Sequence, residues 1–428
     1  DNSVARIALA KNVDILDGIE CNSATFTMVY EIFDTLVKLE EDGSVSPCLA
    51  TSWEQVDDYT WHLTLREGVT FSNGEPFNAE SAVYTLNYLV NKTPTYKYSS
   101  KWASAWPYTV EADGEYAITI TTAEPCLETM ALLSRIAMWP TGSAEPGIYE
   151  EFIKNPVGTG PYMLESWTLD ENITLVANPD YWGEPVKIQR LSYDIITDTS
   201  ARSVAVQSGE YDLVLGLNYD DAAALEAGSI TGMELLQVES TGMQYLFFNG
   251  RSENPFIQDP EFRKAMTYAI DYEGILSQLL LGYCDGAQGI APIVENINNT
   301  YAGEGYPEYD PEKAMELAEA CGYNGEEISL YYASGQFTND MEITELIVSL
   351  LNAAGFNVVM QEVDAASWST IRPTSEYDIA LNSTSGPATG QPTDLITQVL
   401  GVSAGWSWDD VNELVSQCYA EGITDEKF

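Results

Sequence analysis

Two hydrophobic periods divide the chain into predicted strands and helices. Runs in which apolar and polar residues alternate predict half-buried strands, whereas apolar residues three and four positions apart predict helices. The predicted strands cover residues 4–10, 53–55, 59–65, 108–111, 116–121, 162–168, 173–177, 188–196, 211–217, 237–249, 328–332, 358–362 and 377–382. The predicted helices cover 24–37, 78–90, 127–138, 199–208 and 340–354. Hairpins mixed with strand–helix–strand units indicate an α/β fold with an antiparallel insert.

Two further helices are predicted from the residues at their N-termini. Asp259-Pro260-Glu261 and Asp310-Pro311-Glu312 each offer an aspartate as N-cap, a proline at the first helical position and an acid in the first turn. Gly322 follows the second helix, and glycine is the residue that most often ends a helix. We therefore expect helices to begin at both sites.

Net charge excludes one class of partner. The 428 residues include 66 acidic and 18 basic side chains, which gives a net charge of −48. Charged residues make up only 20% of the chain, so the acidity reflects a shortage of lysine and arginine. Such a field repels phosphate backbones and anionic lipid. We expect no nucleic-acid partner.

The residue inventory gives no support for catalysis. His62 is the only histidine, which argues against histidine-based triads and histidine-rich zinc sites. Gly158-Thr159-Gly160 resembles the start of a dinucleotide loop, but Pro161 follows and the third glycine is missing. Paired carboxylates would suit a glycosidase, yet no pair stands in a distinctive setting. We expect no enzymatic activity, no cofactor and no metal site.

Cysteine and targeting signals leave alternatives open. The six cysteines lie far apart, which fits up to three disulfides in an oxidising compartment or buried free thiols. No apolar run approaches the roughly 18 residues of a membrane span. No signal peptide or lipid-attachment cysteine opens the sequence, which predicts either a mature exported form or a cytosolic protein.

Several segments, in the same order along the chain, carry a family resemblance. They include GVTFSNGEPFNAESAVY at 68–84, PVGTGPY at 156–162, NPDYWG at 178–183 and SGEYD at 208–212, and further matches lie at 49–54, 59–67, 262–271 and 309–314. Together they resemble the extracytoplasmic solute-binding proteins of ABC importers, in the branch that takes oligopeptides, dipeptides and nickel complexes. The aromatic residues of these motifs, such as Trp182, are interpreted as scaffold.

The resemblance implies a two-lobed periplasmic-binding-protein fold with an extra α/β domain inserted in the first lobe. The first lobe would take residues 1–45 and 160–238, the insert 46–159, and the second lobe 239–428. In relatives the chain later returns to the first lobe, and this sequence stops at Phe428 before that return. The implied protein is a monomer outside the cytoplasm, lipid-anchored or periplasmic, in a mature form without its signal peptide. It would bind a peptide or another small solute and pass it to the permease subunits of the transporter.

Candidate ligand residues follow from the rule that α/β lobes bind ligands at the carboxyl ends of strands. Three loops qualify: 20–26, 334–337 and 382–389. The residues predicted to touch the ligand there are Asn22, Thr25, Phe26, Gln336, Phe337, Asn382, Ser383, Thr384 and Ser385. Trp406 is predicted either to stack on the ligand or to pack in the core.

The third loop departs from the family pattern. Peptide binders of this branch typically place an aspartate there to hold the peptide ammonium, near a tryptophan, and this sequence has neither between 382 and 392. A buried ammonium without a counter-charge is unfavourable by several kcal/mol, so a free peptide N-terminus is met elsewhere, for example by Asp394, or not at all. Peptide remains the leading ligand class. An oligosaccharide or another neutral polar solute is the alternative, a carboxylate-based hydrolase is a remote one, and nickel held directly by histidines is excluded by the histidine count.

Overall fold

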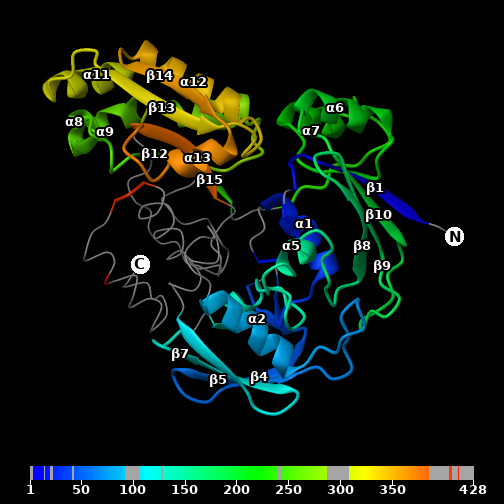
Figure 1. Cartoon of the computed structure of the whole chain (residues 1–428). Helices are drawn as coiled ribbons and strands as arrows, with labels where there is room; N and C mark the ends of the chain where they lie inside the picture. Colours follow the sequence, from blue (N-terminus) through cyan, green and yellow to red (C-terminus); the bar gives the residue numbers. More distant parts are fainter. Residues whose placement is uncertain are drawn as a thin grey trace. The chain divides into compact units, whose positions relative to one another are not determined.

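The computed structural model describes residues 3–13, 15–19, 23–40, 43–91, 107–126, 129–238, 242–286, 308–384, 404–406 and 413. The chain divides into two compact units, one that runs to Gly216 and one that starts at Leu217 (Figure 1). Each unit combines sheets with helices, which confirms the α/β class. No helix among the described residues has the length and apolarity needed to cross a membrane.

A five-stranded mixed sheet organises one part of the first unit. Its order is β11-β1-β10-β9-β8. The strands are β1 (Val4–Leu9), β8 (Tyr162–Thr168), β9 (Asn172–Ala177), β10 (Arg190–Ile195) and β11 (Leu213–Val214). β1 runs parallel to β10 and β11, while β9 runs antiparallel to both β8 and β10. α1 (Ser23–Ile32) packs on this sheet through a core that includes Ile32, Phe33 and Trp139, and α6 (Thr199–Ser208) leads into β11.

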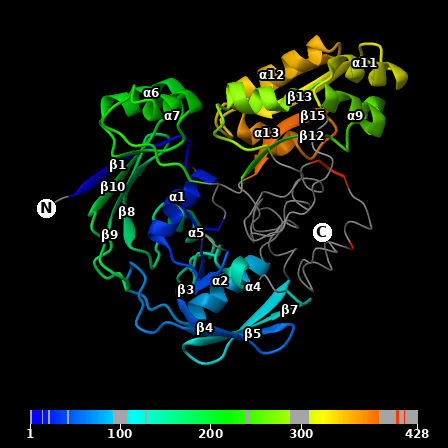
Figure 2. The same ribbon diagram turned by 180° about the vertical axis from the view of Figure 1, so that it is seen from behind.

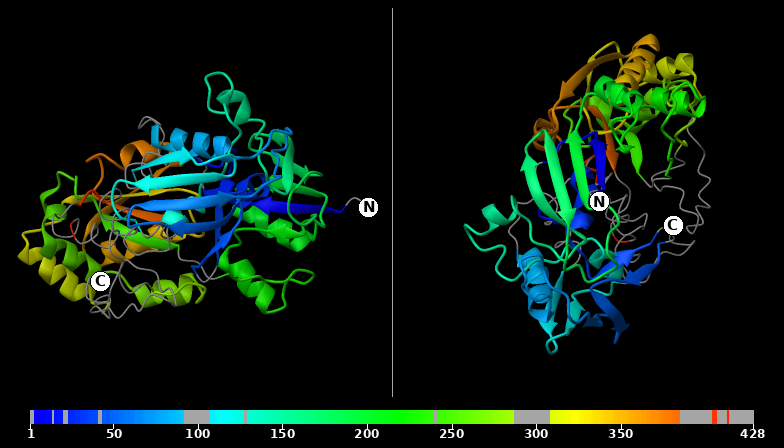
Figure 3. Two further views of the ribbon diagram at one scale, coloured as in Figure 1. Left: turned by 90° about the horizontal axis from the view of Figure 1, so that it is seen from below. Right: turned by 90° about the vertical axis from the view of Figure 1, so that its right-hand side faces the viewer.

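A second, antiparallel sheet organises the rest of the first unit. Its order is β4-β5-β7-β6, and Figure 3 shows these strands in blue and cyan. The strands are β4 (Ala50–Gln55), β5 (Thr60–Leu65), β6 (Tyr108–Ala112) and β7 (Ala117–Thr122). α2 (Ala79–Asn91) covers it through Ala82, Leu86 and Leu89. The short pair β2 (Val37–Leu39) and β3 (Val45–Pro47) and the helices α4 (Thr129–Leu133) and α5 (Tyr149–Phe152) complete the unit.

The second unit is built on a four-stranded sheet with helices on both faces (Figure 2). Its order is β12-β15-β13-β14, formed by β12 (Met243–Phe248), β15 (Ile379–Thr384), β13 (Glu327–Ala333) and β14 (Asn357–Val363). One face carries Ile328, Leu330 and Val358 and packs against α9 (Pro260–Tyr268), α11 (Pro311–Ala320) and α12 (Asp340–Ala353). The other face carries Phe247 and Ala380 and packs against Trp368 of α13 (Ala365–Ile371). The unit also contains α7 (Tyr219–Glu226), α8 (Pro255–Gln258), α10 (Tyr272–Gly274) and the π-helical turn η1 (Ile275–Leu279).

Most predicted elements are present, and two predicted helices end early because of tertiary pairing. The strand predicted over 211–217 is also shorter, covering only Leu213–Val214. The helix predicted over 24–37 ends at Ile32, and the one predicted over 127–138 is helical only over Thr129–Leu133. The two missing ends meet each other: Thr35 forms a β-bridge with Ala137, and Met138 N donates to Asp34 O at 3.0 Å. Both helix predictions were therefore too long. Asp259 and Asp310 do cap α9 and α11, as predicted.

The five-stranded sheet and the two four-stranded sheets each lie within one of the predicted domain ranges, whereas the pair of β2 and β3 crosses the boundary predicted at 45/46. The two compact units divide after Gly216, earlier than the lobe boundary predicted at 238. The division into lobes and insert stays a prediction. The number of possible disulfides is smaller than the sequence allowed, because Cys48, Cys284 and Cys321 are free thiols. Three disulfides therefore cannot form in this structure. Cys21 and Cys418 lie outside the described residues.

Candidate ligand-binding site

Two of the three predicted ligand loops meet at one edge of the second unit's sheet. β13 and β15 are parallel neighbours, with Tyr332 opposite Leu381, so the chain after Ala333 and the end of β15 reach the same edge. β12 runs antiparallel beside β15 and places Tyr245 opposite Asn382. This carboxyl edge is formed by residues 334–337, Asn382–Thr384 and the first residues of β12. Within the described part of the chain the two loops thus share one edge, and their contact with a ligand stays a prediction.

Asn382 is the most deeply placed of the predicted residues at the carboxyl edge. Its side chain is only 6% exposed, and its Nδ2 donates a hydrogen bond to Tyr245 Oη at 3.2 Å. Ser383 is half-buried on the same strand. Thr384 is the last residue of β15, and only its backbone is described. Ser385 lies outside the described residues. The edge thus offers an amide and a phenol side by side, a neutral polar pair.

The loop that carries Gln336 and Phe337 is held by an acidic side chain that the sequence did not single out. Gln336 N donates to Asp340 Oδ2 at 2.8 Å, and Asp340 is 8% exposed. Burial raises the pKa of the Asp340 carboxyl, and the N–H groups of Gln336, Phe337, Met341 and Gly335 act in the opposite direction. Phe337 itself packs against the core on the face of the sheet that carries Ile328, Leu330 and Val358.

The first predicted loop lies in the first unit. Asn22 is outside the described residues, and Thr25 and Phe26 lie in α1 with side chains outside the description. The turn that leads to this loop is fixed by Asp17, whose Oδ1 accepts from Ile19 N at 2.9 Å and whose Oδ2 accepts from Tyr149 Oη at 2.7 Å. Whether this loop touches a ligand stays a prediction.

Trp406 lies away from the carboxyl edge. Its Nε1 donates to Phe248 O at 2.9 Å, and Phe248 is opposite Ile379, at the start of β15. The guanidinium carbon of Arg263 stands 4.5 Å from the centre of the indole ring. Asn382 is three residues further along β15 from Ile379, about 10 Å at the usual rise of a strand. This geometry fits the alternative in which Trp406 packs in the core.

A buried aspartate joins residues that lie in or beside three of the family-like motifs. Asp34 is 4% exposed, and its Oδ2 accepts from Trp182 Nε1 at 2.7 Å and from Thr159 Oγ1 at 3.1 Å. Cys48 Sγ lies 3.7 Å from its Oδ1. The Arg66 guanidinium stacks on Trp182, 4.4 Å from the ring centre. These motifs are scaffold, as interpreted from the sequence, and Asp34 is the residue at their centre that the sequence reasoning missed.

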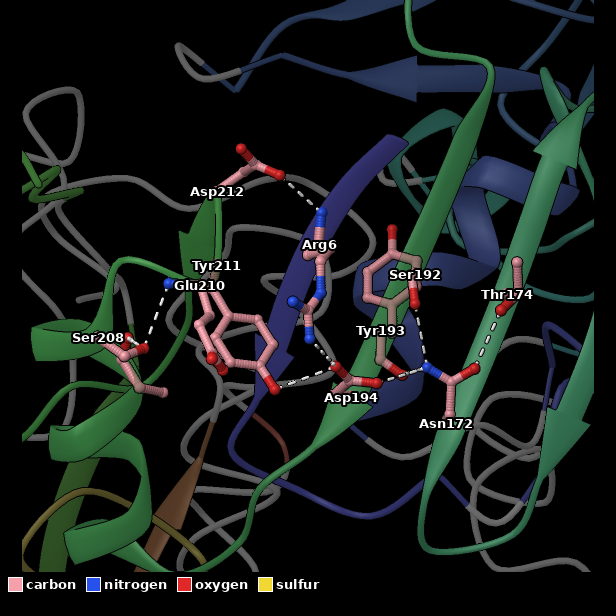
Figure 4. Close-up of polar contacts among 11 residues, drawn as sticks. Arg6, Asn172, Thr174, Ser192, Tyr193, Asp194, Ser208, Glu210, Tyr211 and Asp212 are labelled. Atoms are coloured by element: carbon pink, nitrogen blue, oxygen red, sulfur yellow. Dashed lines mark hydrogen bonds and ion pairs between the residues drawn. The ribbon is translucent and has the colours of Figure 1, made fainter. Parts of the chain in front are cut away.

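The SGEYD motif at 208–212 also binds strands together (Figure 4). Asp212 Oδ2 accepts from Arg6 N at 2.8 Å, which joins the start of β11 to β1. Tyr211 Oη donates to Asp194 Oδ2 at 3.0 Å, and Asn172 Nδ2 donates to Asp194 Oδ1 at 2.6 Å. Arg6 reaches the same carboxylate at 3.5 Å and lies over the Tyr211 ring. The motif therefore ties β11 to β1 and β10, and Asn172 ties β10 to β9 through the same carboxylate.

Metal chemistry has no candidate within the part of the chain that the structure describes. His62 lies on β5, with Nδ1 3.3 Å from Thr119 Oγ1 and 3.6 Å from the exposed carboxylate of Asp113. The described residues contain no group of three or more histidine, cysteine, aspartate or glutamate side chains that could hold a metal ion.

Comparison with known proteins finds solute-binding proteins. The sequence profile of the bacterial extracellular solute-binding proteins, family 5 (middle region), matches residues 44–406. The nickel-binding periplasmic protein of Escherichia coli K12 is 31% identical over 305 residues, which cover 69% of this chain and 56% of that protein. The glutathione-binding protein GsiB of Salmonella typhi is 27% identical over 372 residues, covering 84% of this chain and 69% of that protein. The chain thus spans little more than half the length of the nickel-binding relative.

Solved structures show the same fold. A periplasmic binding protein, DppA, from Helicobacter pylori in complex with the peptide STSA superimposes with a TM-score of 0.84 at 21% identity, covering 100% of this chain and 88% of that chain. A dipeptide-binding protein from Pseudoalteromonas sp. SM9913 in complex with Met-Leu gives a TM-score of 0.85 at 20% identity, covering 99% of this chain and 89% of that chain. The expected periplasmic-binding-protein fold is confirmed.

Proposed function

Because this chain belongs to family 5 of the bacterial extracellular solute-binding proteins, we propose that it is the substrate-binding component of an ABC importer. It captures a small solute, with peptide as the leading class, and delivers it to the permease subunits. The observation that carries this proposal is the family match over residues 44–406. The relatives are binding proteins rather than enzymes. We extend that to this chain as a protein without catalytic activity, and turnover of any candidate substrate would overturn the extension.

The proposed location is outside the cytoplasm, where the first relative is named as periplasmic. The protein is proposed to act as a monomer in the mature form, either free in the periplasm or held at the cell surface by lipid. A monomer suits a carrier that must present the same face to a permease in each cycle. Sedimentation equilibrium tests the oligomeric state, and a concentration-dependent dimer would contradict it.

Ligand class is the first property to measure. Peptide leads because relatives of known structure hold peptides, whereas the neutral pair of Asn382 and Tyr245 suits a hydroxyl-rich ligand. We expect a thermal-shift screen to respond to peptide pools and not to oligosaccharide pools. If only sugars respond, the peptide assignment is wrong. In that case Asn382→Ala should weaken sugar binding by about 1–3 kcal/mol through lost hydrogen bonds.

The charge balance gives a second expectation. With 66 acidic and 18 basic residues, the protein should show no retention on heparin and no binding to DNA or RNA at low salt, where electrostatic attraction is least screened. Column retention and a filter-binding assay measure this. Saturable binding at 20 mM salt (about 20 Å Debye length) would reveal a basic surface and contradict the prediction.

A further inference from the structure

Asp340 is a buried carboxylate of the second unit to which the proposed function assigns no role. It is the first residue of α12, and the residue before it, Asn339, has a left-handed backbone (φ 60°) and makes no side-chain capping bond. Asp340 does not cap its own helix in the usual way. Its carboxylate is instead turned back toward the preceding loop, where it accepts the N–H of Gln336 at 2.8 Å.

The loop that Asp340 holds has an unusual backbone that needs support. Gly335 also has a positive φ, 76°, so two left-handed residues bracket Gln336 and Phe337 within five positions. A non-glycine residue in that region is unfavourable by about 1–3 kcal/mol and persists only where surrounding contacts fix it. The carboxylate supplies such contacts, since the N–H groups of Gly335 and Phe337 face it together with that of Gln336.

The direction of these N–H groups sets the direction of the carbonyl groups. In a trans peptide the C=O of one residue points opposite to the N–H of the next. With the N–H groups of Gly335 and Gln336 turned toward Asp340, the carbonyl oxygens of Ser334 and Gly335 are turned away from it. They lie at the carboxyl edge, where the neighbouring strand ends in Asn382–Thr384. The edge therefore presents successive backbone acceptors, with a carboxylate behind them.

Resting on the proposed function, we propose that Asp340 is a positioning residue that holds the loop 334–337 so that its carbonyl oxygens receive the ammonium group of a peptide ligand. Carbonyl oxygens suit an N–H donor, and a negative charge on the carboxylate behind them adds a favourable potential. This arrangement would meet the ammonium without the aspartate that the segment 382–392 lacks.

Asp340→Asn tests the proposal, and Asp378→Asn is the matched control. Asp378 is also a buried carboxylate of this unit, 9% exposed, and accepts from Ser329 N at 2.9 Å and Ser252 Oγ at 2.6 Å. It precedes β15 and so lies at the opposite edge of the sheet from the loop. Both variants replace one buried carboxylate by an amide, but only in Asp340→Asn does the group that holds the loop lose its charge and one of its two acceptor oxygens.

Two readouts separate positioning from stability. Hydrogen exchange of the Gln336 amide should become about ten-fold faster in Asp340→Asn, the scale of one charge-assisted hydrogen bond, and stay unchanged in Asp378→Asn. Calorimetry with the dipeptide Met-Leu and with its N-acetyl derivative should show that the wild type prefers the free amine by about ten-fold. Asp340→Asn should lose this preference, and Asp378→Asn should keep it.

Retained amine preference in Asp340→Asn, or unchanged exchange at Gln336, overturns the proposal. If the wild type binds no member of a peptide pool, the peptide assignment and the ammonium role fail together, while the exchange data still decide whether Asp340 positions the loop. Should Asp340→Asn not fold, Asp340→Glu keeps the charge but moves the carboxylate by one methylene. It is expected to show the same loss of preference, and full retention would count against the proposal.

Discussion

Asp34→Ala should destabilise the first unit by about 3 kcal/mol, because a buried hydroxyl and a half-buried indole N–H lose their acceptor. Trp182 Nε1 and Thr159 Oγ1 both donate to Asp34 Oδ2, and the side chain is 4% exposed. A buried donor left without a partner is unfavourable by about 1–3 kcal/mol. Urea denaturation followed by hydrogen exchange in α1 and β8 measures the loss. A change below 1 kcal/mol would show that the three motifs do not depend on this carboxylate.

Asp34→Asn separates the hydrogen bonds from the charge. An amide oxygen can take both donors while the buried negative charge is removed, so this variant should remain close to the wild type in stability. Burial is the main cause that raises the pKa of Asp34. The folded state therefore holds its proton more tightly than the unfolded state, and the stability from this group is complete below the unfolded pKa and lost as the pH rises through the raised pKa.

Measuring stability as a function of pH tests whether the charge of Asp34 is responsible for the difference between Asp34→Asn and the wild type. Because the wild type loses stability from this group as the pH rises, the stability of Asp34→Asn relative to the wild type should improve between pH 4 and pH 8. Comparing the two proteins at each pH cancels the titration of the other acidic groups. A relative stability that falls across this range would mean that the ionised form of Asp34 is the one that the fold favours.

The fold was largely predictable because its signals are local. Alternation located the strands, and Asp-Pro-Glu located the starts of α9 and α11. The errors lie where distant backbone segments pair. Nothing in the apolar spacing of residues 24–37 shows that Thr35 will bridge to Ala137 and end α1 early. Such pairing depends on contacts more than 100 residues apart, which a local pattern does not contain.

The candidate site was predictable at the level of loops and not of roles. The rule that α/β lobes bind ligands at the carboxyl ends of strands selects loops 334–337 and 382–384, and the pairing of β13 with β15 places them at one edge. The function of Asp340 could not, because an acid in the first turn of a helix is ordinary and only the backbone shows which N–H groups it faces. For Trp406 the sequence left stacking and packing open, and only the structure shows its indole N–H bound to Phe248 O, three strand positions from Asn382.

Gly158→Ala should destabilise the first unit by about 3 kcal/mol, the upper end of the usual range for overpacking. A Cβ at this position would stand 2.0 Å from Ile32 O and 2.9 Å from Phe33 Cδ1. The obstacle is the backbone at the end of α1, which a rotamer change cannot move. The loop is also tied there by Gly160 N, which donates to Ile32 O at 2.9 Å, and by Gly158 O, which accepts from Ser72 N at 2.9 Å. Relief of the clash would therefore break hydrogen bonds.

Gly68→Ala is the control that distinguishes close approach from backbone freedom. Gly68 has a φ of 76° with open space around its Cβ position, so alanine there meets left-handed strain alone, about 1–2 kcal/mol. Denaturation of both variants, with exchange rates read in α1, should show the larger loss and the faster α1 exchange in Gly158→Ala. Equal losses, or an α1 that stays protected, would mean that the loop can move away from α1. The glycines of PVGTGPY would then serve chain flexibility instead of the contact of this loop with the end of α1.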